Sequence, residues 1–298
     1  MAVYSELFGI NRLPVSRRSQ KEGLKANASR GRRPVVTAGM AIFCAFGIQA
    51  YAEDGTGAEG PDANSWNFAA GFGAVRTARY PGSRDDYTRV LPLVSVLYGR
   101  FFFGALPDAA TPAGFGFNIV QDKHWRFGLA LGTEIRKPRR ASDAPLLRGW
   151  GDIKGTENGA VFGGYDSEWF AIHGTVSQDI GGKHEGLFAR LAIEGKLHPT
   201  EKLDLLGGPE IGWANKRNMQ TFFGVDAAQS AIAGIPQYKV QSGVEDWVFS
   251  LGANYRLTSK WALGAKASYG KYVGDAADSP VTTDKNQSMF GLFAIYRF

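Results

Sequence analysis

Alternation between apolar residues and small or polar residues recurs along the chain from about residue 65 onward. In the segment 247–257 every odd-numbered residue is apolar, and most even-numbered residues are small or polar. The segments 261–270 and 125–136 repeat this pattern. A period of two residues is typical of a β-strand that has one apolar face. The chain is therefore expected to fold predominantly into strands.

The composition of the two faces selects between a soluble sandwich and a membrane barrel. The polar faces carry mainly Gly, Ala and Ser with isolated charges, and the apolar faces begin or end in Trp or Tyr. A soluble sheet would expose a more polar face to water. Aromatic residues at the ends of apolar faces are typical of transmembrane barrels. Strands of about ten residues suit a tilted crossing, and only closure satisfies every strand backbone group in hydrocarbon.

Connection lengths predict the topology. We expect tight turns at 98–100, 121–123, 166–168, 198–201 and 258–260, with long loops at 137–156, 214–245 and 272–287. Short periplasmic turns, long extracellular loops and termini on the periplasmic side describe bacterial barrels. The fold class is thus all-β, a closed antiparallel transmembrane β-barrel of about 12 strands over residues 65–298. The predicted strands lie near 65–76, 87–98, 100–106, 114–121, 124–136, 157–166, 168–178, 187–197, 202–213, 246–257, 260–271 and 288–298.

The longest predicted loop, 214–245, contains two apolar segments, 222–225 and 231–233. A loop tip in water would be more polar. We therefore expect this loop to fold inward or over the mouth of the barrel.

Six of the seven tryptophans fall at strand ends. Four of them open strands that run outward, which predicts a periplasmic interface, and two flank the longest loop, which predicts the outer interface. Aromatic belts of this kind mark the two boundaries of a membrane; the alternative is a set of ordinary core aromatics. The predicted membrane-interface girdle is Trp66, Trp125, Trp169, Trp213, Trp247 and Trp261.

The first 52 residues have the composition of an export signal. Their eight basic and two acidic residues account for the whole net charge of +6, so the remainder is neutral and gives no case for a nucleic-acid partner. A basic run at 30–33 precedes an apolar run at 35–48 and the triplet Ala50-Tyr51-Ala52. This order predicts a signal peptide over 1–52 with a long basic n-region, cleaved after Ala52, and a periplasmic N-terminal stub over 53–64.

Two other interpretations of the apolar run are disfavoured. A transmembrane anchor needs roughly 20 apolar residues, which exceeds this run. Lipoprotein processing at Cys44, the one cysteine, is disfavoured by the bulky Phe43 before it. The mature chain would then carry no cysteine, which excludes a disulfide framework and a cysteine-based metal site.

The predicted interior carries charges of both signs. Such charges either pair and plug a narrow barrel or line a small aqueous path, since twelve strands lie between filled eight-stranded barrels and open porins. The predicted lumen-facing residues are Arg126, Glu134, Arg136, Arg190, Glu194, Lys196, Asp204, Glu210, Arg256 and Lys266.

The sequence gives little support for a catalytic site or a metal site. His173 is the one histidine in mid-strand, with Thr175 on the same face, but no third residue completes a catalytic set. Asp275, Asp278 and Asp284 form an acidic outer loop, for which a solvated loop is favoured over cation bridging to lipopolysaccharide. The chain is expected not to be an enzyme and to bind no cofactor or metal.

The C-terminus ends on alternating apolar residues. Tyr296 and Phe298 resemble the C-terminal assembly signal of outer-membrane proteins that the barrel-assembly machinery reads. This ending predicts that machinery as a partner. It also predicts the bacterial outer membrane as the location, reached through the periplasm.

Scattered motifs over the mature chain resemble the MltA-interacting protein (MipA/OmpV) family of outer-membrane proteins, although the long N-terminal extension departs from the family pattern. The matching motifs are Tyr80-Pro81-Gly82-Ser83, Pro92, Leu147-Arg148-Gly149-Trp150-Gly151-Asp152-Ile153, Glu157, Gly159, Phe222-Phe223-Gly224-Val225, Ser230, Gly234, Tyr238, Asp278-Ser279-Pro280 and Tyr296-Arg297-Phe298.

The resemblance implies a scaffold linked to a murein transglycosylase and a murein synthase; other members are described as adhesins or linked to osmotic or antibiotic response. We therefore expect a non-enzymatic outer-membrane barrel in contact with membrane lipids and lipopolysaccharide, with a scaffold role in the cell envelope. The alternatives are a narrow diffusion channel for small solutes and a surface adhesin. The short turns offer a periplasmic enzyme a surface that is small compared with the roughly 800 Å² per partner of a standard interface.

Overall fold

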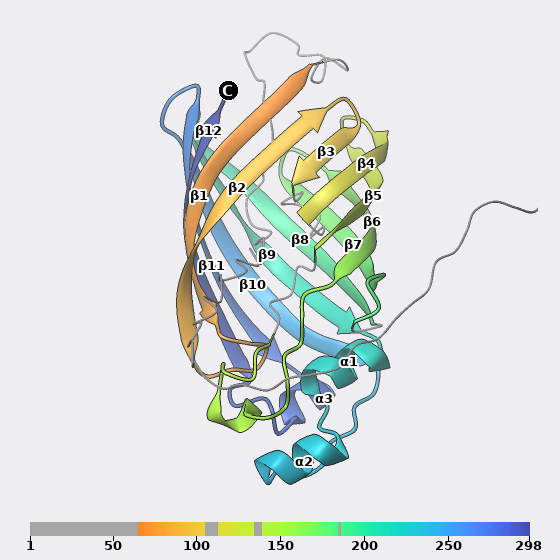
Figure 1. The fold of residues 1–298 in the computed structure, drawn as a ribbon. Helices are drawn as coiled ribbons and strands as arrows, with labels where there is room; N and C mark the ends of the chain where they lie inside the picture. Colours follow the sequence, from red (N-terminus) through yellow and green to blue (C-terminus); the bar gives the residue numbers. More distant parts are fainter. Residues whose placement is uncertain (1–64, 105–112, 134–138, 184–185) are drawn as a thin grey trace, which may run out of the picture. The chain divides into compact units, whose positions relative to one another are not determined.

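Twelve antiparallel strands, each paired with its neighbours in sequence, close into one barrel in which β1 pairs with β12 (Figure 1). The computed structural model describes residues 65–104, 113–133, 139–183 and 186–298. The predicted signal peptide 1–52 and stub 53–64 lie outside these residues. The strands are β1 (Trp66–Ala78), β2 (Asp86–Tyr98), β3 (Phe101–Gly104), β4 (Ala113–Gln121), β5 (Trp125–Thr133), β6 (Glu157–Asp166), β7 (Phe170–Asp179), β8 (Leu187–Thr200), β9 (Leu203–Ala214), β10 (Gly243–Arg256), β11 (Trp261–Tyr272) and β12 (Asn286–Arg297).

The predicted fold class, a closed antiparallel transmembrane barrel of about twelve strands, is confirmed. Short and long connections alternate around it, so the barrel has a turn end, where residues such as 99–100 and 167–169 join strands, and a loop end. The described helices all belong to loop-end connections (Figure 1). They are the 3-10 helix η1 (Pro145–Leu147) and the α-helices α1 (Lys216–Phe223), α2 (Ala227–Ala233) and α3 (Gly274–Asp278).

The outer surface of the barrel is apolar, and the alternating strands explain why. On β10, Leu251 is 59% exposed whereas its neighbour Ser250 is 6% exposed. The same alternation puts Phe72, Phe115 and Val161 on the outside of their strands. A continuous band of exposed large apolar side chains is incompatible with water at that surface and matches the lipid-facing band of a membrane barrel. None of the described helices has the length and apolar character needed to cross a membrane.

The helices of the longest loop are encoded locally. Asn215 caps α1 by accepting a hydrogen bond from the backbone N–H of Asn218 at 3.0 Å. Asp226 and Gln229 form a reciprocal capping box at the start of α2, which satisfies two orphan donors at once. Gly234 ends α2 with a φ of 68°, a conformation that glycine adopts without a Cβ penalty. The loop is therefore a folded unit with defined helix ends.

Candidate functional site

One side of the barrel interior is packed with apolar side chains, and we term it the apolar wall. Val75 on β1, Leu91 on β2 and Phe293 on β12 form one buried cluster. A second cluster joins Phe102 on β3 to Phe162 on β6, whose ring centroids lie 5.8 Å apart in an edge-to-face arrangement. Aromatic pairs in this geometry favour each other beyond the area they bury. Apolar side chains therefore fill the interior at these positions.

The opposite side, formed by β8 to β11, is the charged wall. Arg190 on β8 reaches Asp246 on β10 at 3.2 Å and Glu210 on β9 at 3.4 Å. Glu210 also accepts a hydrogen bond from the Ser250 hydroxyl at 3.1 Å and lies 4.0 Å from the Lys266 ammonium. The network thus pairs two cations with two anions, and its side chains are mostly buried. The buried carboxylate of Glu245 also acts electrostatically on Arg190. Charges of both signs therefore lie close together on this wall.

A second set of charges lies toward the turn end. Lys196 is 3% exposed and pairs with Asp166 on the neighbouring hairpin. His198 contacts Asp204 at 2.8 Å. The guanidinium of Arg256 donates to the backbone carbonyl of Glu201. These contacts tie adjacent strands together at the rim.

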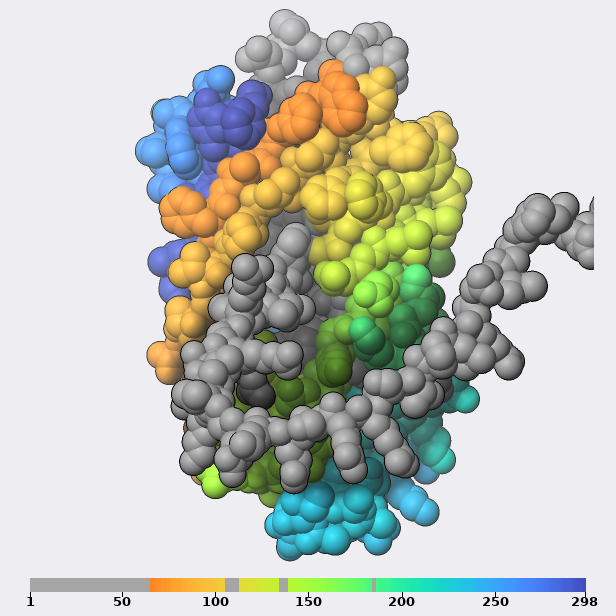
Figure 2. Space-filling view, viewed as in Figure 1, coloured from red at the N-terminus to blue at the C-terminus, as the bar shows by residue number. Residues whose placement is uncertain are grey.

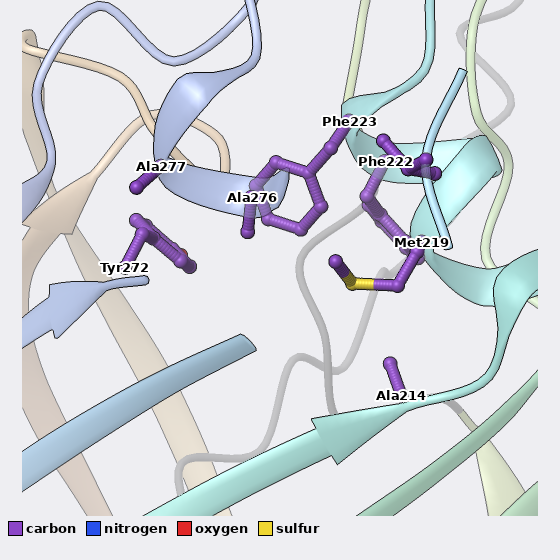
Figure 3. Close-up of a cluster of buried hydrophobic side chains, with 8 residues drawn as sticks. Ala214, Met219, Phe222, Phe223, Tyr272, Ala276 and Ala277 are labelled. Carbon is purple, nitrogen blue, oxygen red and sulfur yellow. The ribbon is translucent and has the colours of Figure 1, made fainter. Parts of the chain in front are cut away.

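A helical cap with its own hydrophobic core lies at the loop end. Met219, Phe222 and Phe223 of α1 pack against Ala276 and Ala277 of α3 (Figure 3). The same cluster contains residues of the barrel strands: Ala214, Tyr272 and the partly buried Phe188. These three residues alternate with outward-facing neighbours, so their side chains face the interior. The cap is thus docked on the inside of the mouth, in agreement with the prediction for the 214–245 loop.

The cap is tied to four loop-end connections. A second buried cluster brings together Tyr80, Leu147, Val225 and Val281, one from each of these connections. Ser279 Oγ donates to the carbonyl of Phe223 at 2.5 Å.

Arg139 is 3% exposed and lies inside the cap. It donates from Nη1 to the carbonyl of Phe222 at 2.9 Å, and its guanidinium lies 5.4 Å from the centroid of the Trp150 ring. Burial lowers the pKa of Arg139 to about 10, because the charged form loses hydration. These contacts connect Arg139 to α1 and to the loop that contains Trp150.

The predicted charged residues occupy inward-facing strand positions wherever the structure describes them; Glu134 and Arg136 lie outside the described residues. Sequence reasoning missed two acidic partners, Asp166 and Asp246, because each lies at the very end of its predicted strand. It also missed the apolar wall. The described inward-facing set is Arg126, Arg190, Glu194, Lys196, Asp204, Glu210, Arg256 and Lys266.

The predicted girdle residues all have exposed side chains near strand ends. Their exposed fractions range from 38% at Trp213 to 64% at Trp169. At the turn end, Trp261 contacts Tyr296 with ring centroids 5.1 Å apart, and Tyr296 contacts the terminal Phe298. The full set is Trp66, Trp125, Trp169, Trp213, Trp247 and Trp261.

The weaker candidate sites have ordinary surroundings. His173 and Thr175 both face inward on β7. In the acidic loop, Asp275 accepts from the backbone N–H of Gln241 at 2.7 Å, and Asp278 pairs with Lys285 at 2.9 Å. Among the described residues, no group of three or more histidines, cysteines or carboxylates is placed to hold a metal ion.

Fold and interior together define a transmembrane β-barrel with a docked cap at its loop end. The family model for the MltA-interacting protein MipA matches residues 70–298. The chain therefore belongs to the MipA family, as the sequence motifs predicted. No curated protein matches the chain.

Several solved barrels resemble the chain in outline. OprB of Pseudomonas putida is 8% identical, with 80% of this chain and 95% of that chain covered and a TM-score of 0.40. The NanC porin is also 8% identical, with coverages of 78% and 100% and a TM-score of 0.38. The outer membrane channel DcaP of Acinetobacter baumannii is 10% identical, with coverages of 78% and 96% and a TM-score of 0.36.

Proposed function

We propose that this chain is a non-enzymatic outer-membrane barrel that acts as an envelope scaffold for murein-processing enzymes, and not as an open pore. The observation that carries the proposal is the cap, whose core includes inward-facing residues of three strands at the loop end. A freely conducting pore needs a continuous aqueous path. A docked hydrophobic core at one end and the apolar wall below it both oppose such a path.

The location in the outer membrane rests on the surface of the barrel. The exposed apolar band suits lipid tails, and the girdle tryptophans suit the two interfaces. The terminal Phe298, part of the ending that resembles the assembly signal, is 75% exposed on the closed barrel. The predicted signal peptide would deliver the chain to the periplasm. Lipids and lipopolysaccharide are then the partners of the outer surface.

The scaffold role rests on the family description, which names MltA as an interacting partner. If the short connections face the periplasm, a murein transglycosylase or murein synthase would meet the turn end. Capture of both purified enzymes by the immobilised barrel tests this. Replacing the exposed turn-end lysines Lys123, Lys202 and Lys260 by serine is expected to reduce capture at least tenfold.

The matched control replaces three exposed loop-end lysines, Lys183, Lys216 and Lys239, by serine. This variant has the same net charge as the turn-end variant, and it should capture both enzymes as the unmodified barrel does. Equal loss in the two variants would mean a non-specific charge effect, and no capture by the unmodified barrel would refute the scaffold role.

A narrow diffusion channel is the second candidate, and the charged wall favours it, because paired charges of both signs can line a thin water path. Planar bilayers distinguish the two functions. The proposed scaffold gives no steady channel events from the pure protein. Regular conductance steps from the unmodified chain would favour the channel function over the scaffold function.

A further inference from the structure

Exposed positive charge gathers at the loop end of β9, β10 and β11. We term this group the basic rim; it consists of Lys216, Arg217, Lys239 and Lys271, whose side chains are all exposed. The first three lie in the connection between β9 and β10, which is coloured cyan and forms the lowest coloured surface in Figure 2. Within 211–246 and 269–273, Asp226 is the one exposed acidic residue. The exposed surface of this part of the barrel is therefore positive.

Hydrogen bonds bring the residues of the basic rim to one part of the loop end. The backbone N–H of Lys216 donates to Ser242 Oγ at 2.8 Å, so the start of α1 lies beside the end of the same loop. The backbone N–H of Gln241 donates to Asp275 Oδ2 at 2.7 Å, so this end of the loop also lies beside the residues that follow β11. The third basic residue is two positions before Gln241, and Lys271 is four positions before Asp275.

Lys271 faces the lipid side of the barrel. It lies directly opposite Trp247 in the β10–β11 pair, and residues opposite each other project from the same face of a sheet. Trp247 is exposed and contacts Tyr269 edge to face, with ring centroids 6.0 Å apart. Lys271 has no acidic partner among the described residues. Its charge is therefore open to an anion at the membrane interface.

The acidic groups near the basic rim are already engaged. Asp246 and Glu210 pair with Arg190 inside the barrel. Glu245 is buried, and the carboxylate of Asp275 accepts a backbone N–H. These carboxylates are thus buried or bonded, whereas the cations of the basic rim are exposed.

Two of the basic residues are unfavourable for the helix that contains them. Lys216 and Arg217 occupy the first turn of α1, which has no acidic residue there. Cations near the N-terminus of a helix oppose its dipole, whereas anions stabilise it. The stability of α1 therefore does not account for these two charges, and an external anion would compensate them.

An apolar surface for acyl chains continues from the basic rim toward the turn end. Ile211 on β9 and Phe249 and Leu251 on β10 are exposed and face outward. Trp213 and Trp247 lie between these residues and the basic rim, as aromatic residues do at the membrane interface. Basic, aromatic and apolar side chains thus follow one another in the order of the head group, the interface and the tails of an anionic lipid.

We infer that the basic rim binds the phosphate of an anionic lipid in the leaflet that surrounds the loop end, with the acyl chains of this lipid on the apolar surface of β9 and β10. A free phosphate ion would contact the basic rim alone and would leave the apolar surface unused. If the loops face outward, the lipid is lipopolysaccharide, and this step alone rests on the proposed location. Lipid binding does not depend on the scaffold role, because the murein enzymes are proposed to meet the turn end.

Spin-labelled lipids test the inference in phosphatidylcholine vesicles that contain the full barrel. A fluorophore is attached to Phe249→Cys in a Cys44→Ser background, and the vesicles contain a small fraction of chain-labelled phosphatidylglycerol or chain-labelled phosphatidylcholine. Quenching gives the relative association constant of each labelled lipid. The constant for phosphatidylglycerol is expected to be at least about fivefold higher, the factor that a single basic residue near an anionic lipid surface provides.

Charge variants identify the residues responsible for this preference. Replacing all four residues of the basic rim by glutamine should remove it, and Lys271→Arg should retain it. The matched control has the same net charge as the four-residue variant and should keep the preference. It replaces four exposed residues of the turn end, Arg100, Lys123, Lys202 and Lys260, by glutamine.

A second label position separates a local site from the overall charge of the barrel. Val176 is exposed and faces outward on β7, near the exposed charges of opposite sign on Glu157 and Lys183. A label at Val176→Cys should therefore show little preference for phosphatidylglycerol. An equal preference at Val176→Cys and Phe249→Cys would overturn the assignment to the basic rim.

Three further outcomes are decisive. Equal association of the two lipids at Phe249→Cys would overturn the inference, and so would a preference that survives in the four-residue variant. Inorganic phosphate at the concentration of the labelled lipid should leave the preference unchanged; its loss would mean that the basic rim binds the free ion and not the lipid. Heat-modifiable gel mobility establishes that each variant is folded. None of these measurements involves a murein enzyme, so their failure would leave the scaffold proposal to its own test.

Discussion

The two sides of the barrel interior fill the space between the strands with different kinds of side chain. On the apolar wall, Phe102 and Phe162 fill the space with aromatic rings. On the charged wall, Arg190 fills it by bridging two carboxylates. The strands of both sides share one alternation and one backbone pattern. The difference shows that the inward face of a barrel strand need not be polar. It can be filled by apolar side chains, or it can carry charges that pair with one another.

The apolar wall and the charged wall differ in how they contribute to the free energy of unfolding. Buried aromatic packing stabilises in proportion to the area removed from water. Buried ion pairs lose hydration, so the Coulomb gain of the Arg190 network offsets a cost of its own. We therefore expect the apolar wall to carry more of the stability and the charged wall to be sensitive mainly to loss of balance.

The largest expected effect is on the apolar wall. Phe162→Ala should lower the free energy of unfolding by about 3–4 kcal/mol, because Phe162 is 2% exposed and the lost ring leaves a cavity. Its outward neighbour Val161 is 61% exposed, so Val161→Ala should cost less than about 1 kcal/mol. Urea unfolding in lipid vesicles, followed by tryptophan fluorescence, measures both. Equal costs would mean that the inward face of β6 is no better packed than its outward face.

The next effect is on the charged wall. Arg190→Met leaves Asp246 and Glu210 with less compensation, and we expect a loss of about 2–3 kcal/mol, reduced from a fully buried pair because part of the network is exposed. Adding Asp246→Asn and Glu210→Gln to Arg190→Met should recover more than half of that loss, since the two carboxylates that pair with Arg190 are then neutral. A triple variant less stable than Arg190→Met would show that the network contributes more than charge balance.

A smaller difference in stability is expected between the substitution of an inward-facing glycine and that of an outward-facing glycine. A Cβ added at Gly116 would lie 1.9 Å from the ring of Phe102, whereas one at Gly174 would meet no atom closer than 3.9 Å. Gly116→Ala should therefore cost about 2 kcal/mol by overpacking the apolar wall, and Gly174→Ala should be neutral or slightly stabilising. The same unfolding assay compares them. A neutral Gly116→Ala would mean that the apolar wall is loosely packed.

Much of the barrel was predictable because strand alternation is local. The number of strands, their order and the alternation of turns and loops follow from patterns such as that of 247–257. The pairing of Arg190 with Asp246 was not predictable, because the two residues are 56 positions apart and meet only once β9 fixes the register between β8 and β10. Phe162 was missed since its strand has bulky apolar residues on both faces, so periodicity alone does not tell inside from outside.

The smallest effect concerns one hydroxyl on the charged wall. Ser250 donates to Glu210 at 3.1 Å, and Ser268 on the neighbouring strand has no hydrogen-bond partner for its side chain within the described residues. Ser250→Ala should cost about 1 kcal/mol, the net value of one such bond, and Ser268→Ala should cost only a few tenths. The two substitutions are chemically identical and lie directly opposite each other across the β10–β11 pair. If they cost the same, the hydroxyl of Ser250 adds nothing to the charged wall, and Arg190 and Lys266 alone compensate Glu210.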